Sequence, residues 1–165
     1  MDIKTIENTI ITPTLKDLGL FSDKSLFLLS AICAHESKCG KYLDQIGYEG
    51  TDQGLGLYAM QSNTATDLEN YFHRKIVFDK SEKHKTWWEK AKSYRHSNET
   101  FFFNLKYNHV YGTALCRLFF IRFDEPLPPA GDIEAAAKYW KKYYNTRLGK
   151  GTVEKFVKDW EEANA

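Results

Sequence analysis

The sequence predicts a single, mainly helical domain with one small glycine-rich lobe. Apolar residues recur at helical spacing along most of the chain, while glycines gather between residues 41 and 61, where the helical period disappears. We expect loops or a small β-hairpin there. No repeat or convincing linker divides the 165 residues, which suffice for one core. Residues 1–165 are therefore expected to fold as one unit.

Two helices are expected before the lobe. The first spans residues 14–18, with a proline at its start and a glycine after its end. The second follows Ser22 and Asp23, either of which can cap it, and ends by residue 40. It is nearly apolar all round, as a buried central helix would be, and Glu36 lies in its last turn.

The helices expected after the lobe follow from apolar periodicity and capping residues. Their predicted ranges are 63–72, 81–94, 104–123, 133–144 and 153–163. Pro126 and the prolines after it require the third of these helices to stop before residue 126. Asp132 can cap the fourth. Trp87 and Trp88 lie in the second, where they serve either packing or substrate specificity.

The composition excludes two classes of partner. The net charge is only +1 and the lysines are scattered, so no basic stripe for nucleic acid is present and we expect no nucleic-acid partner. The first strongly apolar segment, residues 26–33, is too short to cross a bilayer, and we expect no membrane insertion. The aromatic content of 15% suits either an aromatic core or a groove that holds sugar rings.

The cysteines argue against a disulfide framework, because Cys33, Cys39 and Cys116 make an odd number. A metal site from Cys33, His35 and Cys39 lacks a second pair at zinc spacing, so we expect no metal and no cofactor. A nucleophile pair of Cys33 or Cys39 with His35 or His109 would indicate a peptidase. No fixed spacing supports that pair, and it stays a minor alternative.

Glu36 is the candidate general acid. Apolar residues of its own helix can exclude water from the carboxyl group, which raises its pKa as a general acid near neutral pH requires. His35 is adjacent, but neighbours on a helix point about 100° apart, so we expect it to pack or to face the surface. On these grounds alone, Glu36 could equally be a solvated helix end.

Several short words, in chain order, resemble motifs of the soluble lytic transglycosylases. They are Ala34-His35-Glu36-Ser37, Gly56-Leu57-Tyr58-Ala59-Met60-Gln61, Asn104-Leu105, Tyr111-Gly112-Thr113-Ala114-Leu115, and Ala135-Ala136-Ala137 leading to Tyr143-Tyr144-Asn145. The resemblance covers roughly residues 26–149 and implies a lysozyme-like fold. Tyr58 and Ala59 interrupt what would be Gly-Leu-Met-Gln, and residues 72–103 have no clear counterpart in the family.

The resemblance implies cleavage of the β-1,4 bond between N-acetylmuramic acid and N-acetylglucosamine in peptidoglycan glycan strands. Glu36 would protonate the glycosidic oxygen and then act as base, leaving a 1,6-anhydro end without a metal or cofactor. Tyr144 matches the family tyrosine that hydrogen-bonds this carboxyl group. The residues implied to bind the substrate are Ser37, Gly56, Leu57, Tyr58, Met60, Gln61, Tyr144 and Asn145.

Three other functions remain open. A hydrolytic muramidase would need a second carboxylate to place water, for which Asp44, Glu49 and Asp52 are candidates, although each is also expected as a solvated loop acid. A lysozyme-like module of a phage particle or secretion apparatus could have lost activity, which fold alone does not reveal. An enzyme acting on chitin is the third.

The location of the substrate bears on delivery. Residues 1–20 contain no apolar signal core followed by a small-residue cleavage site, so we expect synthesis in the cytoplasm without a signal peptide. The cell wall lies outside the cytoplasm, and a holin, a phage particle or a secretion system would have to deliver the protein. An immunity or inhibitor protein is expected as a partner only if the protein is a secreted antibacterial effector.

Overall fold

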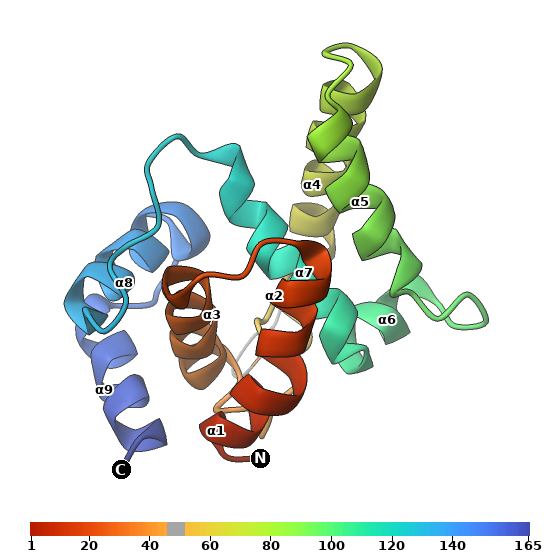
Figure 1. The fold of residues 1–165 in the computed structure, drawn as a ribbon. Helices are drawn as coiled ribbons and strands as arrows, with labels where there is room; N and C mark the ends of the chain where they lie inside the picture. Colours follow the sequence, from red (N-terminus) through yellow and green to blue (C-terminus); the bar gives the residue numbers. More distant parts are fainter. Residues whose placement is uncertain (46–51) are drawn as a thin grey trace.

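The computed structural model describes residues 1–45 and 52–165, which are mainly helical (Figure 1). The elements are α1 (Ile3–Ile6), η1 (Glu7–Ile11), α2 (Thr12–Leu18), α3 (Asp23–Glu36), α4 (Ser62–Val77), α5 (Glu82–Ser93), α6 (Phe101–Tyr107), α7 (His109–Phe119), η2 (Phe120–Arg122), α8 (Ile133–Trp140), η3 (Lys141–Asn145) and α9 (Val153–Ala163). The mainly α class is confirmed. No strand lies in these ranges, where isolated antiparallel bridges join Asp44 to Leu55 and Leu55 to Met60.

Capping residues set the bounds of the predicted helices. Ser22 and Ser25 form a reciprocal capping box at the start of α3. Gly19 ends α2 in the left-handed conformation, with φ +76°. The side chains of Asp132 and Thr152 accept hydrogen bonds from the first turns of α8 and α9. The helices predicted at 81–94 and 153–163 correspond closely to α5 and α9.

The single helix predicted over residues 104–123 is wrong. The chain forms α6 and α7 instead, because Asn108 leaves the helical conformation and its carboxamide caps α7 by accepting from the Tyr111 N–H at 3.1 Å. Its amide nitrogen also donates to the Tyr94 carbonyl at 2.7 Å, which fixes the end of α5. The stop before Pro126 is correct, since η2 ends at Arg122.

Two helical stretches contain wide π turns that periodicity did not predict. Helix begins at Ile3 and passes through η1 before Pro13, where the Thr12 N–H reaches back to the Glu7 carbonyl. At the other end of the chain, α8 ends at Trp140 and continues as η3. The helix predicted over 133–144 thus covers the right residues, but its last turn is a π turn and not an α turn.

Helix α7 runs through the middle of the molecule (Figure 1). On one side it packs against α2, η1 and α3, and α8 and α9 pack against α3 and against each other. On the other side it packs against α4, α5 and α6. Each side has its own apolar cluster. Trp88 belongs to the second, stacked on Phe72 with ring centroids 5.0 Å apart, so it packs α5 against α4. None of the described helices is long and apolar enough to span a membrane.

Gly56 holds the glycine-rich lobe against α6. Its φ is +82°, and an added Cβ would lie 2.4 Å from the Leu105 carbonyl oxygen. We expect Gly56→Ala to lower the free energy of unfolding by about 3 kcal/mol, because strain and a backbone clash add. Gly19→Ala is the matched control, with positive φ but open space around the added Cβ, and should cost about 1 kcal/mol. Urea unfolding measures both, and equal losses would contradict the close approach.

Candidate functional site

The carboxyl group of Glu36 lies at the end of α3, beside α8. The indole Nε1–H of Trp140 donates a hydrogen bond to Oε1 at 2.8 Å. Within residues 1–45 and 52–165, no hydrogen bond to Oε2 is formed, and Glu36 as a whole residue stays partly exposed. Because an indole N–H only donates, Oε1 is the acceptor and Oε2 carries the proton of the neutral acid. The proton is thus on the oxygen that Trp140 does not hold.

Burial raises the pKa of Glu36 to about 7. Loss of hydration is the largest cause, the Trp140 hydrogen bond opposes it, and repulsion from the Asp159 carboxylate adds to it. A carboxyl group with this pKa is present in both protonation states near neutral pH. One residue can therefore donate a proton and later accept one, as a single acid and base must.

The raised pKa also predicts how stability depends on pH. Between about pH 4.5 and pH 7, Glu36 is ionised in the unfolded chain but protonated in the folded one, so the folded state binds more protons. The stabilisation is fully present below pH 4.5 and is lost as the pH rises to about 7, by roughly 3 kcal/mol in all.

Glu36→Gln should therefore gain stability relative to the wild type as the pH rises. Glutamine keeps an oxygen that accepts from Trp140 but has no charge to bury. The difference in unfolding free energy between variant and wild type, measured in urea, should be larger at pH 8 than at pH 4.5 by roughly 3 kcal/mol. The same difference at both pH values would contradict the raised pKa.

The residues implied to bind substrate divide by burial. The buried ones are Ser37, Gly56, Leu57, Tyr58 and Met60. The partly exposed ones are Gln61, Tyr144 and Asn145. The buried residues contribute to packing in this structure, and their role in substrate binding stays a prediction. Gln61 starts α4 as its N-cap, and Asn145 accepts from Lys141 Nζ at 2.6 Å.

Ser37 shapes the turn after α3. Its hydroxyl donates to the Cys33 carbonyl at 3.2 Å and accepts from the Gly40 N–H at 2.9 Å. It is fully buried, so these bonds fix the backbone that follows Glu36.

Tyr144 does not bond the acid, which corrects the role implied by the resemblance. Its hydroxyl donates to the Tyr58 carbonyl at 2.6 Å, and the donor to Glu36 is Trp140, four residues earlier. The Tyr58 hydroxyl in turn lies 2.8 Å from Thr113 Oγ1. These bonds fasten the glycine-rich lobe to α7 and η3 beside the acid.

The candidate second carboxylates have structural partners. Asp44 pairs with Lys106 at 2.9 Å on the surface. Asp52 accepts from the backbone N–H and the hydroxyl of Ser62, at 2.9 and 2.6 Å, and so caps α4. Glu49 lies outside the described residues. In the described structure Asp44 and Asp52 thus each have a structural role.

The thiols do not form an activated nucleophile. Cys33, Cys39 and Cys116 are free and buried. Burial raises the pKa of Cys33 to about 12, whereas a nucleophilic cysteine needs a lowered pKa. The His35 ring is bonded to Asp159. Across the described ranges, no group of three or more histidine, cysteine or acidic side chains is arranged to hold a metal ion.

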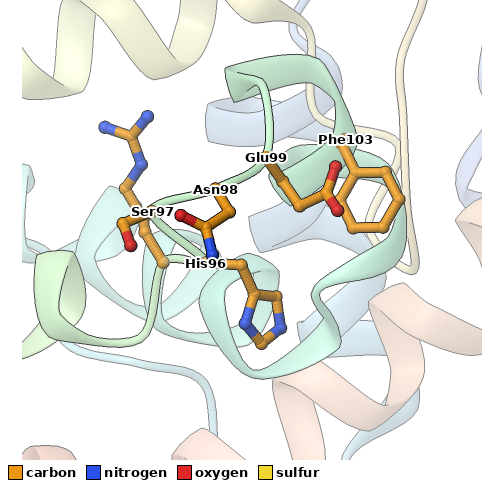
Figure 2. A pocket seen from close by; sticks show the side chains of 6 residues that line it. His96, Ser97, Asn98, Glu99 and Phe103 are labelled. Carbon is orange, nitrogen blue, oxygen red and sulfur yellow. The ribbon is translucent and has the colours of Figure 1, made fainter.

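A separate hollow of about 520 Å³ lies at the loop that joins α5 to α6 (Figure 2). Asn104 fixes its loop, accepting from the His96 N–H at 2.7 Å and donating to the His96 carbonyl at 3.1 Å. None of the predicted site residues lines it. Its lining is Arg95, His96, Ser97, Asn98, Glu99 and Phe103.

Comparisons with family models, curated proteins and solved structures gave no match. The evidence for function is therefore the geometry around Glu36 together with the motif words. Two residues of this site, Trp140 and Asp159, are not predicted from the sequence. Helical spacing is the signal that places both residues on buried faces. Trp140 continues the apolar stripe of α8, and Asp159 lies three residues after the buried Phe156 of α9.

Proposed function

We propose that the protein cleaves the β-1,4 bond between N-acetylmuramic acid and N-acetylglucosamine in bacterial peptidoglycan, on a lysozyme-like fold. The observation that carries the proposal is the state of Glu36. Its carboxyl group lies at the end of a buried helix with a pKa of about 7, Trp140 holds one of its oxygens, and the residue stays partly exposed. The motif words around Glu36, Gln61 and Tyr144 support the substrate class.

The proposed reaction needs only Glu36 and the substrate. Oε2–H protonates the glucosamine O4 as the bond from muramoyl C1 to O4 breaks, and the carboxylate remains. That carboxylate then takes the proton of the muramoyl C6 hydroxyl while the hydroxyl oxygen bonds to C1. This step forms the 1,6-anhydro ring and restores the acid. The nucleophile is part of the substrate, so its effective concentration is high and no water is consumed.

The surroundings of Glu36 favour this intramolecular route over hydrolysis. A hydrolase commonly uses a second carboxylate to place water or to attack the sugar. Asp44 and Asp52 are engaged in an ion pair and a helix cap, and Asp159 is held by three cationic or imidazole groups inside the protein. Among the residues that the structure describes, the candidate carboxylates thus favour the lytic transglycosylase over the hydrolytic muramidase, and Glu49 lies outside them.

One observation favours an inactive structural or binding module instead. Five of the eight residues implied to bind sugar are buried, among them Tyr58, which interrupts the family motif. Release of soluble fragments from dye-labelled peptidoglycan sacculi separates the two functions, with dye-labelled chitin as the control polymer. We expect release from sacculi and none from chitin. Binding to sacculi without release would support the inactive module.

A further inference from the structure

Asp159 is a buried carboxylate that no step of the proposed reaction uses. It lies on α9, and its side chain is only 1% exposed. Oδ2 lies 2.7 Å from His35 Nδ1, while Oδ1 accepts from the ammonium groups of Lys38 and Lys155. Such a charge is costly to bury without partners, so its three bonds imply that it is kept ionised in place.

The contacts continue from Asp159 to the acid. The His35 ring meets the Trp140 indole edge-on, with centroids 4.6 Å apart. Phe156 of α9 packs on the same indole at 4.8 Å, and the Gly151 backbone lies so close that an added Cβ would be 2.5 Å from the indole Cη2. The enclosed indole then donates to Glu36. Its orientation therefore depends on the groups around it.

We propose that Asp159 is a positioning residue for Glu36. Its hydrogen bond orients the His35 ring, which holds the Trp140 indole where the N–H reaches the acid. The proposal rests on the proposed function in one respect, because the reaction that it assists is the cleavage by Glu36. The arrangement itself is independent of substrate.

The titratable groups around Asp159 agree with this role. They are His35 and Glu36 on α3, Lys38 after it, and Lys155 on α9. Burial lowers the pKa of His35 despite the opposing effect of Asp159, so the ring is neutral near pH 7 and its Nδ1–H donates to the carboxylate. Burial would raise the pKa of Asp159, but its bonds to the three neighbours outweigh burial and lower it.

The test follows the indole N–H of Trp140 by NMR in the full-length, ¹⁵N-labelled protein. Trp140→Phe identifies the resonance among the four tryptophans. In the wild type the resonance should titrate with a midpoint of about 7, the pKa of Glu36, and in Glu36→Gln it should not titrate. This measurement needs no substrate, so it reports on the contact whether or not the protein cleaves cell wall.

Asp159→Asn keeps the size of the side chain and removes its charge. We expect it to reduce the amplitude of the Trp140 titration at least about twofold, and to lower kcat for wall cleavage roughly tenfold with little change in KM. Glu162→Gln is the matched control, since Glu162 lies on the same helix in an exposed pair with Lys158 and should change neither quantity.

His35→Ala gives a second test, which holds even if Asp159→Asn fails to fold. It removes the ring between Asp159 and Trp140 and should weaken the titration as Asp159→Asn does, with little further loss in the double variant. An unchanged Trp140 resonance in either folded variant, or fully additive effects, would overturn the positioning role. A wild type that releases no wall fragments would instead overturn the proposed function. The Trp140 resonance would still show whether Asp159 supports the hydrogen bond between Trp140 and Glu36.

Discussion

Glu36→Gln is expected to lower the rate of muropeptide release from peptidoglycan at least about 1000-fold while the protein stays folded. The variant keeps an oxygen for the Trp140 bond but can neither donate nor accept the reacting proton, and acid and base steps each contribute roughly 10²–10⁴-fold. Initial rates on labelled sacculi measure the loss, and circular dichroism checks the fold.

Asp44→Asn is the control for removing a negative charge. Asp44 forms an exposed ion pair with Lys106, and its replacement should leave the rate within about twofold of the wild type. A Glu36→Gln variant that is folded and retains a tenth or more of the wild-type rate would show that another group supplies the proton.

Trp140→Ala is expected to cause the largest loss of stability, about 4 kcal/mol in the free energy of unfolding. The indole is fully buried between α3, α8 and α9, and its removal leaves a cavity beside the ring of Phe156. Urea denaturation at pH 5, where Glu36 is protonated in the folded state, measures the packing contribution with least interference from its charge.

Trp140→Phe isolates the hydrogen bond, since an aromatic ring remains. The indole N–H lowers the pKa of Glu36, so its loss should raise that pKa above the wild-type value of about 7. Cleavage needs the protonated acid, and the activity should therefore persist to higher pH than in the wild type. A pH–rate profile of kcat/KM with the same alkaline limb in both proteins would contradict the bond between Trp140 and Glu36.

The helical architecture could be predicted where local signals decide it. Ser22 at the start of α3 and Gly19 at the end of α2 act within one turn of their own position, and the structure has both caps. The break at Asn108 could not be predicted from periodicity, because the apolar pattern continues across it. There the side chain of Asn108 binds Tyr94, fourteen residues away, and competes with the helix.

The site could be predicted only in part. The apolar helix and the motif words together indicate Glu36, and burial raises its pKa as the apolar helix predicts. Its donor Trp140 is 104 residues away, and Asp159 is 124 residues from His35. Single-sequence patterns contain no information on such pairs. Motif words likewise give residue identity but not burial, so the burial of Met60 and Leu57 could not be predicted from them.

The central claim is that Glu36 cleaves glycan strands as a single acid and base. Mass spectrometry of the soluble products from purified peptidoglycan tests it most directly, with the wild type and Glu36→Gln in parallel. We predict 1,6-anhydro muropeptides, lighter by one water than hydrolysis products, from the wild type alone. Products with reducing ends would show that the protein is a hydrolase and that another group places the water. The absence of fragments from several wall types would contradict the enzymatic function.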